Sequence, residues 1–315
     1  MSLAFVFPGQ GSQSVGMLSD LAEAATVVRE CFSEASEVLG YDLWELTQNG
    51  PAEELNRTEK TQPAMLTAGV AVWRAWQDRG GPRPAMMAGH SLGEITALVC
   101  AESIGFRDAV DLVRFRGEAM QAAVPEGEGG MAAIIGSDDD QVTALCEFAG
   151  EGQVLEAVNF NAPGQVVIAG HKSAIERAVT AAGQYGARRA MLLPVSVPAH
   201  SALMQPAGEK LRAKLAAIEV SRTTLPVYNV DITSHGTPEE IRDAVVRQLS
   251  SPVQWVQIVR AMLAAGADHI VECGPGKVLA GLSRRIDKNA ARVSAVTDSQ
   301  SFAMTLEACN GVSNA

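Results

Sequence analysis

The chain has 315 residues, enough for one large α/β domain or for a domain with a subdomain. Its composition of 47% hydrophobic and 19% charged residues is typical of a globular core and excludes a disordered chain. A formal net charge of −11 excludes nucleic acid as the main partner, because phosphate binding requires a basic surface, although a local basic patch is not excluded.

The first predicted element is a buried strand over Leu3–Phe7, and a glycine-rich loop follows it at residues 8–17. This loop is similar to a dinucleotide-binding turn, but the third glycine of that motif would fall where Ser14 stands. The alternative is that backbone N–H groups of the loop face an active site. Residues 20–39 predict a helix that Asp20 caps and Gly40 ends.

A helix is then predicted after Met65, and beyond it a short apolar strand leads into Gly89-x-Ser91-x-Gly93. This pattern is typical of a sharp strand-to-helix turn that exposes a strained serine nucleophile. The two glycines permit close backbone approach, and the start of the helix favours developing negative charge. Small residues also form tight turns without any chemistry, so the motif alone leaves both interpretations open.

The next predicted helix spans residues 106–120, and Arg116 interrupts its apolar stripe. Arg114, by contrast, falls off that stripe. A guanidinium directed at the core is costly unless an anion meets it. Arg116 therefore either binds an anionic ligand, or reaches solvent, or pairs with a carboxylate elsewhere in the fold.

A glycine-rich joint at residues 125–130 precedes a change in organisation. Strands and helices are predicted in β-α-β-β-α-β order, at 131–135, 138–149, 154–158, 166–169, 173–185 and 190–193. This order is that of a ferredoxin-like unit, inserted between two parts of a larger α/β domain. A turn is predicted at 159–164, where Asn159 and Asn161 either bind an amide-bearing ligand or simply favour the turn.

The remaining chain returns to the larger domain. Helices are predicted at 201–215, at 242–249 and from 251 to about 266, followed by a strand at 269–272. From about residue 300 the sequence becomes small and polar, so we expect the terminus to fray.

A serine hydroxyl becomes a good nucleophile only when a base takes its proton, so a histidine is required. Of five histidines, His90 would point to the opposite face of the strand from its neighbour Ser91, and three others lie in polar turns or open a strand. Elimination leaves His200 as the candidate general base. No acidic residue near it completes a triad, and a backbone carbonyl could orient the imidazole instead.

Several short motifs, taken together and in their order, resemble those of malonyl-CoA:acyl carrier protein transacylases over nearly the whole chain, from residue 3 to about 298. They are FPGQGSQ at 7–13, TQPA at 61–64, GHSLGE at 89–94, RG at 116–117, NFNAPGQ at 159–165, VPAH at 197–200 and GPG at 274–276. The resemblance implies a hydrolase-like α/β core with a parallel sheet, formed by residues 1–126 and 195–315. The inserted ferredoxin-like subdomain would comprise residues 127–194.

The resemblance also implies roles for individual residues. Ser91 would carry the acyl group, His200 would be the base, and Arg116 would bind the malonyl carboxylate. The backbone N–H groups of Gln10 and Leu92 would form the oxyanion hole. The remaining implied roles are orientation of the histidine by the carbonyl of Gln248 and lining of the acyl pocket by Gln62 and Met120.

The predicted function is ping-pong transfer of a malonyl group from malonyl-CoA to the phosphopantetheine thiol of acyl carrier protein, supplying fatty-acid synthesis. The alternatives are a trans-acting acyltransferase of polyketide synthesis, a serine thioesterase or esterase, and a binding protein with an inactive serine. Acyl carrier proteins are acidic, so a basic patch should receive them. Candidates are Lys172, Arg188, Arg189, Lys277, Arg284 and Arg285.

Cysteine usage and hydropathy indicate the compartment. The five cysteines are scattered and lack Cys-x-x-Cys spacing, which suits a reducing cytoplasm, and none resembles a metal ligand or a nucleophile. No apolar run is long enough to span a bilayer. We therefore expect a cytoplasmic protein with no metal and no membrane partner. We also expect a monomer that uses no cofactor.

Overall fold

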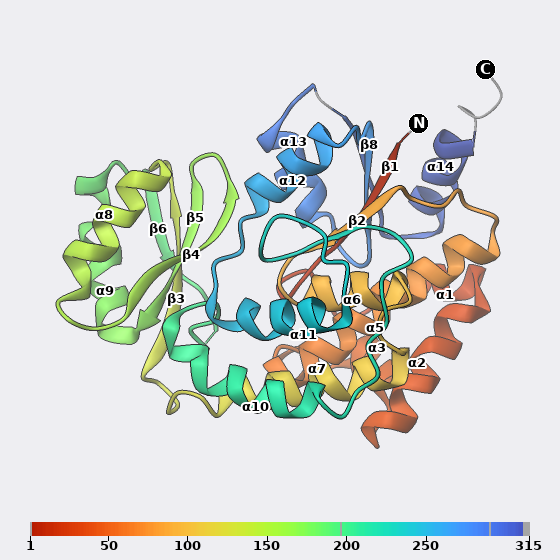
Figure 1. The fold of residues 1–315 in the computed structure, drawn as a ribbon, viewed down its shortest axis with the longest axis horizontal. Coiled ribbons are helices and arrows are strands. Elements are labelled where there is room, and N and C mark those ends of the chain that lie inside the picture. The colour runs from red at the N-terminus through yellow and green to blue at the C-terminus, as the bar shows by residue number, and fades with distance from the viewer. Residues whose placement is uncertain (1, 196, 290, 311–315) are drawn as a thin grey trace.

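The computed structural model describes residues 2–195, 197–289 and 291–310, and it contains two β-sheets that lie side by side (Figure 1). The larger sheet has five parallel strands in the order β7-β2-β1-β8-β9, which confirms the predicted α/β class with a parallel sheet. Its strands are β1 (Leu3–Phe7), β2 (Met86–Gly89), β7 (Val227–Tyr228), β8 (His269–Cys273) and β9 (Arg292–Val296).

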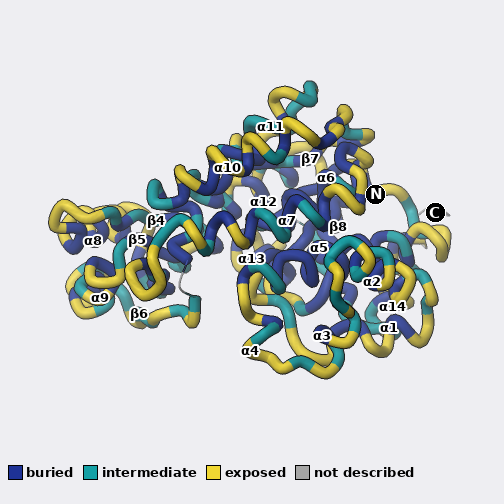
Figure 2. Tube along the Cα trace, turned by 90° about the horizontal axis from the view of Figure 1, so that it is seen from below, coloured by how far each residue is buried: buried dark blue, intermediate teal, exposed yellow. Residues whose placement is uncertain are grey.

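Alternation of side chains along β1 places apolar groups on both faces of this sheet. Phe5 and Phe7 join one apolar cluster, with side chains of α5 (Thr58–Asp78), α6 (Leu92–Cys100) and α7 (Phe106–Gln121). Ala4 and Val6 join another, with side chains of α12 (Trp255–Ala264) and α13 (Val278–Ile286). Helices therefore bury both faces, as parallel sheets require, and α5 runs through the buried interior (Figure 2).

The smaller sheet is antiparallel, with the strand order β4-β5-β3-β6, and forms the left-hand part of Figure 1. Two helices and a 3₁₀ turn pack against it around an apolar cluster of their own. The elements follow the predicted β-α-β-β-α-β order. They are β3 (Gly129–Ile135), α8 (Asp139–Gly150), β4 (Leu155–Ala162), β5 (Gln165–His171), α9 (Lys172–Ala181), η1 (Ala182–Tyr185) and β6 (Arg189–Leu192).

The other helices surround the larger sheet. None of the helices in the described ranges is long and apolar enough to cross a membrane. These helices are α1 (Ser19–Ala24), α2 (Thr26–Leu39), α3 (Leu43–Asn49), α4 (Ala52–Leu55), η2 (Ala202–Met204), α10 (Gln205–Leu215), α11 (Pro238–Arg247), η3 (Gln248–Ser250) and α14 (Ser299–Asn310).

Two helix predictions near the N-terminus are wrong in detail. The helix expected over residues 20–39 is broken at Ala25, whose backbone is extended, and Asp20 lies inside α1, where it accepts a hydrogen bond from the backbone N–H of Ser299 at 2.6 Å. Helix α5 begins at Thr58 and not after Met65, with Pro63 inside it. Proline removes one helical hydrogen bond, but burial of most of α5 in the core outweighs that loss.

The C-terminal prediction is also wrong for the residues that the structure describes. Instead of fraying from residue 300, the chain forms α14 and buries Phe302 and Cys309 against the core. Phe302 meets Trp76 edge-on, with ring centroids 5.9 Å apart. Residues 311–315 lie outside the described residues.

Candidate active site

Ser91 lies at a strained turn between β2 and α6. Its backbone has φ 53° and ψ −113°, a conformation that non-glycine residues rarely adopt. The neighbouring glycines are required by packing, since a Cβ on Gly89 would lie 1.8 Å from the carbonyl carbon of Gly93. A Cβ on Gly93 would lie 2.0 Å from the carbonyl oxygen of Phe7 on β1. The structure therefore has the strand-to-helix turn that the glycine spacing predicts.

The imidazole of His200 joins Ser91 to a backbone carbonyl. His200 Nε2 lies 2.8 Å from Ser91 Oγ, and His200 Nδ1 lies 2.8 Å from the carbonyl oxygen of Gln248. Because that carbonyl can only accept, Nδ1 carries the proton and Nε2 accepts from the serine hydroxyl. Burial, and then the nearby charge of Arg116, lowers the pKa of His200 to about 3, so the imidazole is neutral at pH 7.

Arg116 is a buried cation beside the serine. Its side chain, on α7, is held by neutral oxygens: Nη1 donates to Gln62 Oε1 at 2.8 Å, and Nη2 donates to Gln248 Oε1 at 2.8 Å. Nη2 also lies 3.3 Å from Ser91 Oγ. Arg116 Nε is buried and has no hydrogen-bond partner in the part of the chain that the structure describes.

These contacts exclude two of the three interpretations of Arg116. The residue is only 1% exposed, so it does not reach solvent. No carboxylate of the described residues forms an ion pair with it. Burial lowers the pKa of Arg116 to about 10, which leaves the guanidinium charged at pH 7. A charged group with an unused donor next to a nucleophile is suited to binding an anionic ligand.

The sequence analysis missed the hydrogen bonds that the side chains of Gln248 and Glu94 make. Gln248 Nε2 donates to Glu94 Oε2 at 2.8 Å and to the carbonyl oxygen of Ser91 at 2.9 Å. Glu94 is almost fully buried, and this burial raises its pKa to about 7. The sequence did carry one sign of this contact: Glu94 is a carboxylate in the otherwise apolar first turn of the helix after the serine. Burying a carboxylate there costs free energy unless a polar group bonds to it.

A cavity of about 130 Å³ opens beside Ser91 and lies between the two sheets. Gln10 and Leu92 both line it, and Leu92 is the first residue of α6, where N–H groups lack helical partners. The predicted pocket residues Gln62 and Met120 also line it, with Gln62 Nε2 3.5 Å from Met120 Sδ. The smaller sheet contributes Met131 and Asn159.

The two asparagines differ in position. Both lie within β4, so the turn predicted at residues 159–164 is shorter than expected and comprises only Pro163 and Gly164. Asn159 lines the cavity, and its Oδ1 is buried without a partner among the described residues. Asn161 is not among the lining residues; its Oδ1 lies 2.8 Å from His90 Nε2. Cross-strand pairing with β5 extends the strand through this segment.

Within the described ranges, no group of His, Cys, Asp or Glu side chains is arranged to hold a metal ion.

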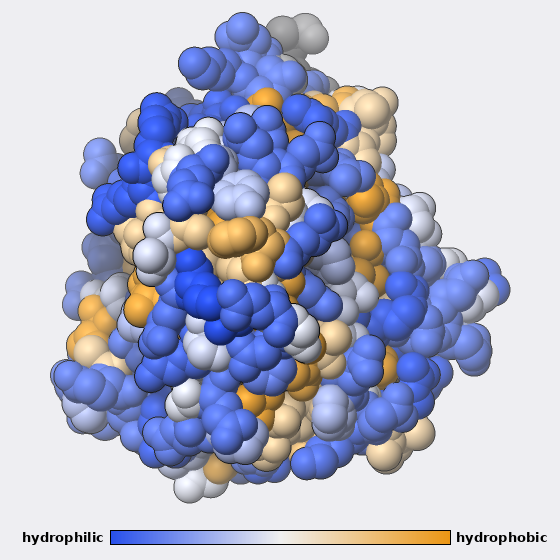
Figure 3. All heavy atoms as spheres, turned by 90° about the vertical axis from the view of Figure 1, so that its left-hand side faces the viewer, coloured by the Kyte–Doolittle hydropathy of each residue, from blue (hydrophilic) through white to orange (hydrophobic). Residues whose placement is uncertain are grey.

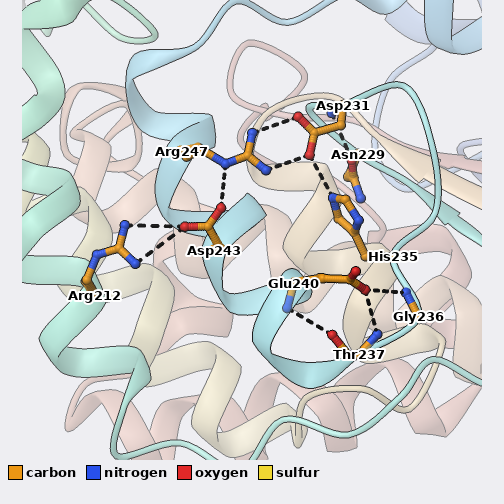
Figure 4. A network of polar contacts seen from close by, with 9 residues as sticks. All are labelled: Arg212, Asn229, Asp231, His235, Gly236, Thr237, Glu240, Asp243 and Arg247. Carbon is orange, nitrogen blue, oxygen red and sulfur yellow. Dashed lines mark hydrogen bonds and ion pairs between the residues drawn. The ribbon is translucent and has the colours of Figure 1, made fainter.

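An ion-pair network surrounds Arg247, the residue that precedes Gln248 (Figure 4). Arg247 makes a bidentate contact with Asp231, at 2.7 Å and 2.6 Å, and its Nε donates to Asp243 at 2.6 Å. Asp231 also accepts from His235 Nε2 at 2.7 Å. The network therefore fixes the end of α11, and with it the backbone that presents the Gln248 carbonyl to His200.

The chain is similar to known proteins over almost all of its length. Residues 4–300 match the family model described as the acyl transferase domain. The curated malonyl CoA-acyl carrier protein transacylase of Escherichia coli K12 is 59% identical over 305 residues, which cover 96% of this chain and 98% of that protein.

Solved structures show the same similarity. One is an acyl carrier protein S-malonyltransferase from Vibrio cholerae, with 53% identity, a TM-score of 0.94 and coverage of 97% of this chain and 100% of that one. Another is a malonyl-transacylase in complex with a type II PKS acyl-carrier protein, with 52% identity and a TM-score of 0.96. That match covers 98% of this chain and 100% of the other.

Proposed function

The chain belongs to the acyl transferase family, and we propose that it carries a malonyl group on Ser91 during transfer from malonyl-CoA to acyl carrier protein. It is 59% identical to one curated malonyl CoA-acyl carrier protein transacylase over 96% of the chain and 61% identical to another over 90%, so it is an acyltransferase of that class. The observation that carries the malonyl assignment is the buried Arg116, a cation 3.3 Å from the hydroxyl of Ser91 with an unused donor. A free carboxylate at the far end of the acyl group would complete its hydrogen bonds.

In the first half of the proposed reaction, His200 Nε2 takes the hydroxyl proton of Ser91, and Oγ attacks the thioester carbonyl carbon. The N–H groups of Gln10 and Leu92 would stabilise the resulting oxyanion, each contributing about 100- to 1000-fold in rate. The C–S bond then breaks, and coenzyme A leaves as a thiol after taking the proton from His200. In the second half, His200 takes the proton of the phosphopantetheine thiol, and the sulfur attacks the carbonyl carbon of the malonyl-serine ester. The C–O bond to Ser91 Oγ then breaks, and Oγ takes the proton back from His200.

We also propose that the chain combines a hydrolase-like core, residues 1–126 and 195–315, with an inserted ferredoxin-like subdomain, residues 127–194. The β-α-β-β-α-β element order supports the subdomain, as does the antiparallel strand order β4-β5-β3-β6. Since residues of both parts line the cavity, the acyl group would bind where they meet.

For the carrier, we propose docking on the basic residues named in the sequence analysis, all of which are exposed. The end of the molecule formed by α8 and α9 is mostly hydrophilic, and its apolar residues form small separate groups (Figure 3). This supports the proposal of a monomer, because no broad apolar face is offered there to a second copy. All five cysteines are free and buried, which supports a cytoplasmic location.

Intact-mass analysis after exposure to malonyl-CoA tests the function. We expect one malonyl adduct on the unmodified chain, none on Ser91→Ala, and complete removal when acyl carrier protein is added. An adduct that decays in buffer at the rate of turnover would favour a thioesterase, and the absence of any adduct would favour a binding protein.

We propose that the carrier is that of fatty-acid synthesis. A relative with 52% identity is seen with a type II PKS acyl-carrier protein, so a role in polyketide synthesis is the alternative. Competition between the two carriers for the malonyl-enzyme would distinguish them, because the cognate carrier should discharge it at the lower concentration.

A further inference from the structure

The side-chain amide of Gln248 holds the two halves of the candidate site together. Its oxygen accepts from Arg116 Nη2 at 2.8 Å, and its nitrogen donates to the carbonyl oxygen of Ser91 at 2.9 Å. The backbone carbonyl of the same residue contacts His200 Nδ1. One residue therefore contacts the cation, the nucleophile and the base, so any displacement of Gln248 would disturb all three.

The second N–H of that amide is bonded to Glu94 Oε2, 2.8 Å away. Glu94 is 3% exposed and lies on α6, three residues after Ser91. In its ionised form the carboxylate only accepts hydrogen bonds, so it meets the nitrogen end of the amide and not the oxygen end. Glu94 and Arg116 thus oppose any rotation that would exchange the two ends of the Gln248 amide.

Other groups are packed around Glu94. On its far side is a small cavity that Asn229, His235 and Ile241 also line. His235 belongs to the network of Figure 4, in which Asp231 and Arg247 fix the end of α11. The carboxylate is therefore enclosed between this network and the Gln248 amide, and it does not reach the reaction cavity beside Ser91.

We propose that Glu94 is a positioning residue: it fixes the Gln248 amide and, through it, the orientation of the Arg116 guanidinium beside Ser91. The inference rests on the proposed function, since it assigns to Glu94 an influence on malonyl recognition. Its effect is geometric, so the hydrogen bond matters more than the carboxylate charge. A glutamine at position 94 can still accept from Gln248 Nε2, whereas a shortened or removed side chain cannot reach it.

The expected effects follow from that distinction. Glu94→Ala should lower the malonyl-to-acetyl ratio of kcat/KM about tenfold, the size of losing one hydrogen bond to a charged group. Glu94→Asp keeps the charge but retracts the oxygens, and should also lower the ratio several-fold. Glu94→Gln should keep the ratio within about threefold of the unmodified enzyme. If Glu94 served only to balance charge, Glu94→Asp would keep the malonyl-to-acetyl ratio and Glu94→Gln would lower it.

The experiment measures kcat/KM for malonyl-CoA and acetyl-CoA with these variants, together with their melting temperatures. Glu272→Gln is the matched control, because Glu272 is also buried but accepts from the backbone N–H of Ala280 on α13. This control should leave the ratio unchanged. If Glu94→Ala does not fold, the aspartate and glutamine variants decide between the two roles.

A double-variant comparison tests whether Glu94 acts through Gln248. If it does, Glu94→Ala combined with Gln248→Ala should lower the ratio no further than Gln248→Ala alone. Independent, additive losses would overturn the proposal, as would a Glu94→Ala or Glu94→Asp enzyme with an unchanged ratio. Failure of the unmodified enzyme to take up malonyl would instead refute the proposed function, so the two failures are distinguishable.

Discussion

Ser91 and His200 are 109 residues apart in the chain, and their side chains are in hydrogen-bond contact at 2.8 Å. Both residues have positive φ, 53° for Ser91 and 68° for His200. Such backbone conformations cost free energy and persist only where the surrounding structure enforces them. Here the turn at the start of α6 and the backbone hydrogen bond from the His200 N–H to the Leu249 carbonyl hold the pair.

We expect His200→Ala to slow acylation of Ser91 by about 100- to 10,000-fold, the usual contribution of a general base. Quenched-flow measurement of the malonyl adduct in a single turnover reports this step directly. His171→Ala is the control, since the His171 imidazole accepts from the backbone N–H of Val154, beside the smaller sheet and not beside Ser91. A rate that His200→Ala leaves unchanged would remove His200 from the mechanism.

Arg116→Ala should reduce the preference for malonyl-CoA over acetyl-CoA by about 100-fold or more. Leaving a buried charge without its partner costs on the order of 3–5 kcal/mol, and an acetyl group offers no carboxylate to the guanidinium. Arg114→Ala is the matched control on the same helix, because Arg114 pairs with Asp111 and Glu118 at the surface. If both variants keep the ratio of kcat/KM, Arg116 has only a structural role.

The parts of the fold with a local signal could be predicted from the sequence. Strand β1 is five consecutive buried apolar residues, and the glycines around Ser91 mark the turn that follows β2. The break at Ala25 has no such signal, because helical spacing of apolar residues continues through it. Strand β7 has two residues and exists only because Val227 and Tyr228 pair with β2.

The candidate site also has a part that local motifs predict and a part that they do not. The motifs around Ser91, Arg116 and His200 indicated which residue types take part. The bond between Glu94 and Gln248 joins residues 154 positions apart, so neither residue carries a local sign of its partner. Long-range contacts of this kind are set by how α6 and η3 pack, which the pattern of each segment alone does not specify.

Glu94 should make stability depend on pH in a defined window. Its pKa is raised from 4.5 to about 7 by burial, so between these values the folded state holds a proton that the unfolded state has lost. The contribution of Glu94 is therefore most favourable below pH 4.5 and is lost as pH rises to 7. Relative to Glu94→Gln, the unmodified protein should lose about 3 kcal/mol of unfolding free energy across this window.

Urea unfolding of both proteins at pH 5 and pH 8 checks this expectation. The difference in unfolding free energy between them should grow at pH 8, because glutamine does not titrate and all other groups are shared. A difference that is the same at both pH values would show that Glu94 has an ordinary pKa in the folded state.

Charge reversal at the two ends of α13, at its N-cap residue Lys277 and in its last turn at Arg284, tests carrier docking. We expect Lys277→Glu combined with Arg284→Glu to raise the KM for acyl carrier protein about ten times more than the KM for malonyl-CoA. The increase should be smaller at high salt, because salt screens surface charges. Arg222→Glu, an exposed charge outside the proposed patch, serves as the control. Equal effects of the two reversals would point to net charge and not to a docking site.

The close packing of the serine turn gives a prediction on stability. At Gly93 an added Cβ would lie 2.0 Å from the carbonyl oxygen of Phe7, which is backbone in the middle of the sheet and cannot move aside cheaply. We expect Gly93→Ala to lower the unfolding free energy by about 3 kcal/mol or to prevent folding, and to abolish acylation of Ser91 because the turn is displaced.

The control for this substitution lies on α13. A Cβ at Gly281 would meet no described heavy atom within 4 Å, and the residue lies inside a helix. Gly281→Ala should therefore stabilise the protein by up to about 1 kcal/mol. Denaturant titration of the two variants separates a steric effect at the turn from a general cost of replacing glycine. A folded Gly93→Ala enzyme with normal acylation would show that the serine turn tolerates a displacement of this size.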